Sequence, residues 1–214
     1  MLPLAQDAWS YLWKLALVAA LCWLFDWGLL AWLFAGLTVF TAFFFRDPER
    51  EAPLDRSLVI SPADGRVMRV EPVGHDEFVG GPAVKVSIFL SVFNVHINRS
   101  PITGVVRLQQ YRAGKMLPAF KSHASDENER NTLGIEGQGV RVLVHQITGF
   151  IARRIVCRKA PGDALLQGQR FGLIKFGSCT ELVLPDHVQV LVAEGEKVKG
   201  GETVIGRIGN ASDQ

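Results

Sequence analysis

A serine that follows a glycine, Gly177–Ser178, ends an apolar run near the C-terminus and is the first candidate for chemistry in this chain. Glycine has no side chain to shield the preceding carbonyl, so the Ser178 hydroxyl can attack its own peptide bond. A serine hydroxyl is a weak nucleophile unless a neighbouring base takes its proton. The same dipeptide is also an ordinary turn, and its meaning depends on the residues that the fold brings to it.

His96 and Asp64 supply the residue types of a base and an orienting acid. His96 lies in the segment SVFNVHINRSP, and a strand over Val92–Ile97 would place it on one face with Asn94. Asp64 lies in SPADG, a turn that leads into a strand. Taken singly, a structural histidine and an Asx-turn aspartate are the ordinary interpretations. Together with Ser178 they are the residue types of an Asp–His–Ser triad, which only geometry can test.

The surroundings of Ser178 argue against an ordinary serine hydrolase, because FGSCT lacks the Gly-x-Ser-x-Gly elbow. Cys22, Cys157 and Cys179 show no metal-ligand spacing, which predicts reduced thiols in a cytosolic setting and no metal site. The net charge of +2 is nearly balanced and gives no indication of nucleic-acid binding.

The N-terminal part is strongly apolar, since Asp26 is the only charged residue from Leu15 to Phe45. Asp26-Trp27-Gly28 divides it into arms of roughly 16 residues, marginal for a full membrane crossing. The sequence therefore predicts a tight helical hairpin with both ends on one side of a membrane. One tilted span, a hairpin dipping into one leaflet and a buried hairpin in a soluble core stay as alternatives. A secretory signal is disfavoured, because its basic start and cleavage site are absent.

The remainder predicts short strands separated by glycine turns, with residues 1–46 as a membrane-associated segment and 47–214 as a β domain. Only Pro161–Gly168 suggests a short helix. A C-terminal G-x-x-V-x-x-G turn is similar to those of lipoyl- and biotinyl-type barrels, so the expected fold is mainly β, a compact barrel-sandwich hybrid preceded by the hydrophobic hairpin. The expected strands are Arg66–Glu71, Ala83–Leu90, Gly104–Gln110, Val140–Gln146, Ile151–Cys157, Leu173–Phe176, Glu181–Leu184, Val188–Ala193 and Thr203–Ile208.

Taken together, these segments resemble the phosphatidylserine decarboxylase proenzymes of the short, membrane-anchored prokaryotic type. The resemblance runs through FFRDP, SPADG, FNVH with RSP, the block ASDENERN, and FGS. One departure follows the Gly-Ser step. Short-type relatives more often carry Arg-Val-Asp there, whereas this chain has Cys179-Thr180-Glu181, closer to the Ser-Thr of the longer type.

The resemblance implies a chain that cuts itself between Gly177 and Ser178 into residues 1–177 and 178–214. Ser178 attacks the Gly177 carbonyl, with His96 as base and Asp64 orienting His96. Ser178 then becomes a pyruvoyl group, which forms a Schiff base with the serine amine of phosphatidylserine and allows CO₂ to leave, giving phosphatidylethanolamine. His96 is the nearest candidate to return a proton.

The resemblance also implies the partners and the location. They are the lipid, the membrane and the chain's own cleaved small chain, with higher oligomers left open and no nucleic acid or metal. The place is the cell (inner) membrane, with the catalytic domain on the cytoplasmic face. Solvated surface charge is the ordinary interpretation for the basic residues that could meet the lipid phosphate, which are Arg112, Lys115, Arg153 and Arg154.

Two other functions remain open at this point. A membrane-tethered, lipoyl-like β module without catalysis would leave the chain whole and Ser178 as a turn residue. However, no lysine has the Met-Lys or Asp-Lys context of a swinging-arm carrier. A pyruvoyl decarboxylase of a soluble amino-acid derivative would keep the self-cleavage and change the substrate.

Overall fold

The structure is a computed structural model that describes residues 3–115, 127–149, 154–175 and 178–209. The chain divides into two compact units, residues 1–49 and 50–214. This division lies three residues beyond the limit expected from the sequence. The Asp47 amide donates to the Pro3 carbonyl at 2.7 Å, and Leu4 forms a β-bridge with Arg46. Arg46 and Asp47 therefore belong with the first unit.

The first unit is a hairpin of two helices, as the sequence predicted. After a short 3-10 helix, η1 (Gln6–Ala8), come α1 (Trp9–Leu24) and α2 (Gly28–Phe44). Asp26 adopts a φ of 57° in the turn between them, and the Trp27 amide donates to the Cys22 carbonyl at 2.8 Å. Short polar residues such as aspartate tolerate that left-handed conformation best.

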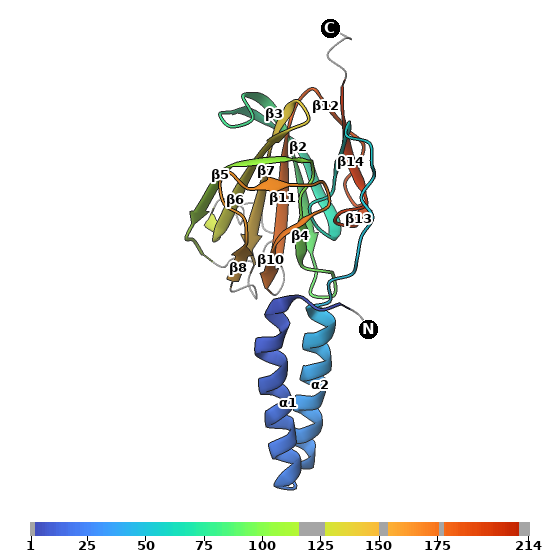
Figure 1. Ribbon diagram of the computed structural model, residues 1–214, viewed down its shortest axis with the longest axis vertical. Helices are drawn as coiled ribbons and strands as arrows, with labels where there is room; N and C mark the ends of the chain where they lie inside the picture. Colours follow the sequence, from blue (N-terminus) through green and yellow to red (C-terminus); the bar gives the residue numbers. More distant parts are fainter. Residues whose placement is uncertain (1–2, 116–126, 150–153, 176–177, 210–214) are drawn as a thin grey trace. The chain divides into compact units, whose positions relative to one another are not determined.

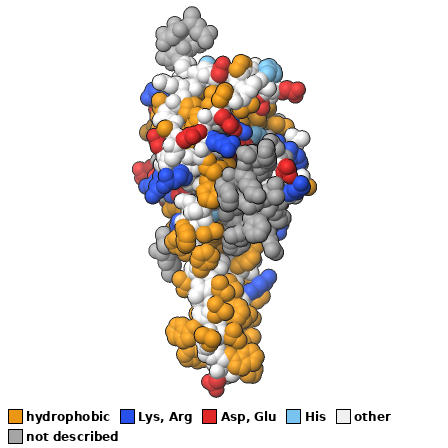
Figure 2. Space-filling model, turned by 180° about the vertical axis from the view of Figure 1, so that it is seen from behind, with side chains coloured by type: hydrophobic (Ala, Val, Ile, Leu, Met, Phe, Trp, Pro, Cys, Tyr) orange, Lys and Arg blue, Asp and Glu red, His pale blue; other side chains and the backbone are white. Residues whose placement is uncertain are grey.

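The surface of this hairpin is hydrophobic over most of its length (Figure 2). Leu29, Leu24 and Trp32 are 87%, 73% and 72% exposed, far more than apolar side chains of this size usually are. Within the described residues, neither helix combines the length and hydropathy needed to cross a membrane.

The second unit is built on one large antiparallel sheet (Figure 1). Its strand order is β13-β2-β3-β11-β7-β6-β5-β9, so β11 (Ser178–Pro185) is a central strand between β3 (Gly81–Leu90) and β7 (Val140–Thr148). The other members are β2 (Gly65–Asp76), β5 (Gly104–Arg112), β6 (Arg130–Gly137), β9 (Ala164–Leu165) and β13 (Lys197–Val198).

Two three-stranded sheets complete the domain. One has the order β4-β10-β8, with β4 (Ile97–Arg99), β10 (Arg170–Lys175) and β8 (Arg154–Cys157). The other has the order β1-β14-β12, with β1 (Leu58–Ile60), β14 (Val204–Ile208) and β12 (Val188–Val190). The mainly β fold expected from the sequence is confirmed.

One face of the large sheet forms the main core. Alternate residues of the central strands point into it, among them Ile88, Val144 and Leu182, all fully buried. This period of two is the pattern that the sequence showed. The core therefore fixes which side chains of β11 face inward, and Ser178 shares that side with Leu182.

Two local expectations are wrong. Pro161–Gly168 is not a helix but a turn followed by β9, because Gly162 and Gly168 have φ angles of 99° and 78°, which a helix does not allow. Val92–Ile97 is not a strand either, since β4 begins only at Ile97 and His96 lies just before it. Strands β1, β6 and β13 were not expected, and residues 151–153 of one expected strand lie outside the described residues.

Candidate active site

Ser178 begins the central strand of the large sheet. It pairs with Leu90 of β3 on one side and with Thr148 of β7 on the other. The side chain is fully buried, and its Oγ has no hydrogen-bond partner among the described residues. An unsatisfied buried hydroxyl costs about 1–3 kcal/mol, so it needs an explanation, and a reactive role is one. Gly177, the other half of the predicted cleavage site, lies outside the described residues.

His96 is also buried, at the start of β4. Its Nδ1 lies 3.0 Å from the Asn94 carbonyl oxygen. Because a carbonyl can only accept, Nδ1 carries the hydrogen, so Nε2 is the nitrogen that has a lone pair when the ring is uncharged. The Ile174 amide donates to the His96 carbonyl at 3.2 Å, which fixes His96 against β10, four residues before Ser178.

Asp64 lies in the turn before β2 and is held by two groups. Arg50 Nη2 donates to its Oδ2 at 3.0 Å, and the Gly200 amide donates to its Oδ1 at 2.8 Å. Arg50 Nη1 also pairs with Glu202 at 3.0 Å. Asp64 therefore joins the first residue of the β domain to a turn near the C-terminus, and its role in orienting His96 stays a prediction.

Backbone contacts bring the Asp64 turn to the His96 segment. The Arg99 amide donates to the Pro62 carbonyl at 2.9 Å, two residues from Asp64 and three from His96. Asn98, between these two residues of the His96 segment, donates to the Thr180 hydroxyl of β11 at 3.1 Å, so the three segments that carry the predicted triad are joined although long stretches of chain separate them.

Cys179 is the rival nucleophile beside Ser178. Alternation along β11 points its side chain to the opposite face of the sheet. Burial, and next the charge of Glu181, raise the pKa of the Cys179 thiol well above its usual value. The thiol therefore stays protonated and is a poor nucleophile.

The sequence analysis missed a group of buried amides on the Ser178 side of the sheet. Gln146 of β7 donates to Asn98 of β4 at 2.9 Å, and Asn98 donates to the Thr180 hydroxyl at 3.1 Å. Asn131 of β6 donates to Gln146 at 2.9 Å. Gln146, at a position of the strand VRVLVHQIT that alternates with apolar residues on one face, was a signal of this group in the sequence.

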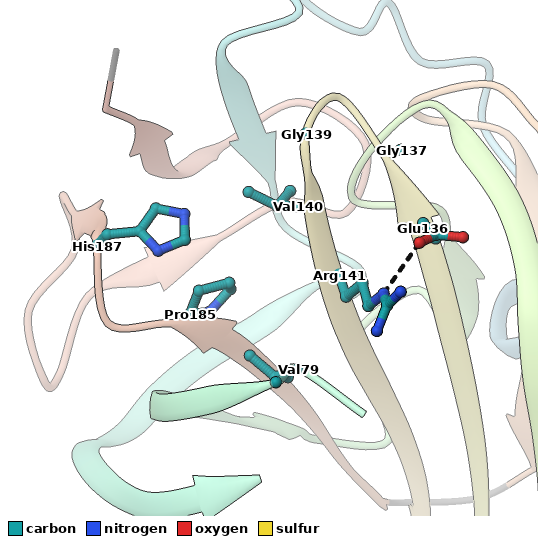
Figure 3. Close-up of a pocket in the computed structure, with 9 residues that line it drawn as sticks. Val79, Glu136, Gly137, Gly139, Val140, Arg141, Pro185 and His187 are labelled. Atoms are coloured by element: carbon teal, nitrogen blue, oxygen red, sulfur yellow. Dashed lines mark hydrogen bonds and ion pairs between the residues drawn. The ribbon is translucent and has the colours of Figure 1, made fainter. Parts of the chain in front are cut away.

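A cavity of about 490 Å³ lies at the other end of β11 and is a different site (Figure 3). Pro185, the last residue of β11, lines it together with His187 and an Arg141–Glu136 ion pair of 2.9 Å. Pro185 lies seven residue steps along the strand from Ser178, a distance of roughly 23 Å. This cavity therefore cannot supply groups to Ser178.

The basic residues considered for the lipid phosphate are dispersed. Arg112 and Arg154 are exposed strand ends, and Lys115 forms an exposed ion pair with Glu127 at 2.8 Å, which raises the pKa of Lys115. Arg153 lies outside the described residues. The described positions fit the interpretation of solvated surface charge.

The second unit is thus a mainly β domain whose central strand begins with a buried serine that has no hydrogen-bond partner among the described residues. A family model described as phosphatidylserine decarboxylase matches residues 37–206. The chain is 58% identical over 182 residues to the phosphatidylserine decarboxylase proenzyme of Carboxydothermus hydrogenoformans, which is 85% of this chain and 84% of that protein. It is 52% identical over 206 residues to that of Symbiobacterium thermophilum, covering 96% and 95% of the two chains. The chain belongs to the phosphatidylserine decarboxylase family.

Proposed function

We propose that this chain is a self-processing decarboxylase that converts phosphatidylserine to phosphatidylethanolamine and CO₂. The observation that carries the proposal is the buried Ser178 Oγ, which lacks a hydrogen-bond partner among the described residues of a chain whose relatives are named proenzymes. A buried hydroxyl without a partner is available to a reaction and is poorly explained as a structural group.

Self-cleavage uses the chain's own groups. His96 Nε2 takes the Ser178 Oγ proton, and Oγ forms a bond to the Gly177 carbonyl carbon. The carbon–nitrogen bond between the two residues breaks as the proton passes from His96 to that nitrogen. In the resulting ester, loss of the Cα proton of residue 178 breaks the Cβ–Oγ bond, so residues 1–177 leave as a carboxylate and a Cα–Cβ double bond forms. Water then replaces the nitrogen of residue 178, releasing ammonia and leaving a pyruvoyl group at the start of the small chain.

The site fits such a group. Position 178 is fully buried, so a ketone formed there is shielded from water. When present, the pyruvoyl group accepts the electron pair that remains on the substrate after CO₂ leaves. His96, fixed by Asn94 and by β10, is the chain's candidate to hold and return the proton.

The fold also explains how two cleaved chains stay together. β11 belongs to the small chain, and it is hydrogen-bonded to β3 on one side and to β7 on the other, both from the large chain. β14 of the small chain pairs with β1 of the large chain. Cleavage before Ser178 leaves these ladders intact, so the product is a heterodimer.

The experiment combines an intact-mass measurement of the purified protein with a lipid assay. We expect two chains, residues 1–177 and 178–214, the second beginning with a pyruvoyl group, and conversion of phosphatidylserine in vesicles. An uncut chain in active protein, or a free serine amine on the small chain, would disprove the self-processing scheme. Processed protein without lipid turnover would favour a soluble amino-acid derivative as substrate.

The exposed apolar hairpin supplies the contact with the bilayer in this proposal, as an interfacial element. A chain that starts at Asp47 keeps Arg50 and every residue of the predicted triad, so it should cut itself at the full rate. In a flotation assay it should lose vesicle binding and turn over vesicle lipid slowly. A folded, truncated chain that failed to cut itself would show that the hairpin is needed for the chemistry.

A further inference from the structure

We propose that Asn98 is a positioning residue for self-cleavage, held in place by Gln146 and Asn131. It joins the three chain segments that carry Asp64, His96 and Ser178. The inference rests on the proposed self-cleavage and assigns it residues outside the predicted triad.

Asn98 is linked to the segments of Asp64 and Ser178 by side-chain hydrogen bonds and to the segment of His96 by its place in the chain. Its Nδ2 donates to the Pro62 carbonyl at 3.4 Å and to the Thr180 hydroxyl at 3.1 Å. Pro62 is two residues from Asp64, and Thr180 is two residues from Ser178 on the same face of β11. Asn98 itself is two residues from His96. One amide group therefore spans the distance between the elements that must meet.

The orientation of the Asn98 amide is determined by a chain of donors. Asn131 Nδ2 donates to Gln146 Oε1 at 2.9 Å, and Gln146 Nε2 donates to Asn98 Oδ1 at 2.9 Å. Because each oxygen is already an acceptor, each nitrogen must point onward, and the last one points to Pro62 and Thr180. All three amides are buried, so a reversed amide would leave donors facing donors without water to relieve them.

The small sheet makes room for this chain of amides. Gly172 of β10 is the register partner of Asn98. A Cβ at Gly172 would lie 2.2 Å from the Val156 carbonyl oxygen and 3.0 Å from Gln146 Nε2. A glycine at this position therefore allows β8, β10 and the amides to approach one another.

The consequence for the reaction is geometric. Attack of Oγ on the preceding carbonyl needs the base, the hydroxyl and the carbonyl aligned, and small displacements lower such rates steeply. The amides carry no charge, and none of them forms a hydrogen bond with the Ser178 Oγ. They hold β4 against β11 and so fix His96 relative to Ser178.

Two neighbouring residues of β7 provide a matched test. Gln146→Met removes the amide on the Ser178 side, and His145→Met removes a buried hydrogen bond to Thr132, of 2.9 Å, on the opposite face. Denaturing electrophoresis after cell-free synthesis measures the rate of self-cleavage, and chemical unfolding measures the stability of each variant. We expect Gln146→Met to cut at least about tenfold more slowly than His145→Met at comparable stability. Equal rates for both would overturn the inference.

Asn98→Asp separates the donor from the shape of the side chain. The aspartate keeps an acceptor for Gln146 Nε2 but as a carboxylate has no hydrogen for Pro62 or Thr180. Protonation restores one donor, and burial raises the pKa at which it occurs. The cleavage rate of purified, uncut Asn98→Asp protein, divided by that of the unaltered chain, should therefore rise as the pH falls. A ratio independent of pH would reduce Asn98 to a packing residue.

The two proposals fail differently. If the unaltered chain is never cut, the proposed function is wrong, whatever the variants do. If the unaltered chain is cut and both Asn98→Asp and Gln146→Met are cut as fast as the unaltered chain, the proposed function stands and the positioning role of Asn98 does not.

Discussion

Two adjacent rows of the large sheet use the same strands for different chemistry. In one row Asn131, Gln146 and Thr180 are register partners across β6, β7 and β11, and their side chains face the Ser178 side. In the next row Thr132, His145, Glu181 and Ser87 are partners across β6, β7, β11 and β3, facing the other side. The first row is neutral and fully closed, whereas the second contains a carboxylate and a histidine.

The difference follows from what covers each face. The small sheet β4-β10-β8 lies over the amide row, so no water reaches it, and neutral groups that satisfy one another are the least costly polar choice. A cavity of about 610 Å³ opens on the second row. There Lys85 lies 3.8 Å from Glu181 and 3.0 Å from Glu71, so the positive charge of Lys85 compensates two carboxylates, of which Glu181 is buried. We therefore expect substitutions on the closed face to disturb the placement of side chains more than substitutions on the face with the cavity.

The largest expected contrast is between the first two residues of β11. Ser178→Ala should abolish cleavage and lipid turnover and leave a folded, uncut chain, because it removes only a hydroxyl without a described partner. The free energy of unfolding should stay equal or rise by less than about 1 kcal/mol. Cys179→Ala, on the opposite face, should still be cut. Intact mass and thermal melting measure both, and a cut Ser178→Ala chain would remove Ser178 from the mechanism.

The two buried histidines should differ almost as much. His96→Ala should slow cleavage by about a hundred- to ten-thousand-fold, the usual loss when a general base is removed. His145 lies on the other face and should not matter for cleavage. A slow His96 variant that is allowed to mature can then be assayed on lipid. Normal turnover would show that another group returns the proton, and normal cleavage would return His96 to a structural role.

On the Ser178 side of the sheet, variants of Asp64 and Arg50 distinguish two contributions of the Asp64 carboxylate, its charge and its ion pair with Arg50. Asp64→Asn keeps the shape of the turn but no longer stabilises a histidinium, and it should slow cleavage at least about tenfold. Arg50→Met breaks the 3.0 Å ion pair and leaves the Asp64 carboxylate in place. If electrophoresis shows the same slowing in both variants, the contribution of Asp64 is the brace and not the orientation of His96.

The smallest expected effect is a pH dependence of stability on the open face. Burial, followed by the positive charges of Arg130 and Lys85, lowers the pKa of His145 from 6.5 to about 3. The unfolded chain then binds the proton more tightly, so the free energy of unfolding falls as the pH drops from 6.5 towards 3. Between pH 7 and 5 this loss is about 2 kcal/mol. Chemical unfolding at pH 7 and pH 5 should show this loss of stability in the unaltered chain and not in His145→Met. An equal loss in His145→Met would show that other groups cause it.

Much of the fold could be predicted from local pattern. Alternation of apolar residues predicted the long strands such as β3, β7 and β11, and the Asp26-Trp27-Gly28 break predicted the helical hairpin. Other strands were missed: β1, β4 and β13 have two or three residues each and are strands only because a partner pairs with them, and the eight-residue β6 was missed as well. The expected helix at Pro161–Gly168 failed because glycine geometry outweighed composition.

The candidate site divides in the same way. Residue types and motifs sufficed to select Ser178, His96 and Asp64, because nucleophile, base and acid are properties of side chains. The burial of Ser178 between β3 and β7 and the contact of Asp64 with the Gly200 amide depend on neighbours far away in the chain, and the hydrogen on His96 Nδ1 depends on the backbone conformation that brings the Asn94 carbonyl to it. No local pattern contains them.

The sequence by itself therefore determined the family, the candidate chemistry and the two kinds of unit, since these depend on residue identity and on periodicity along the chain. Tertiary structure alone decided which groups are neutral, which hydroxyl lacks a partner, and that Asn98 meets Gln146 and Thr180 across three strands. The physical reason is that hydrogen bonding and desolvation depend on distances in space, and a side-chain hydrogen bond between two sheets joins residues as far apart as 98 and 180.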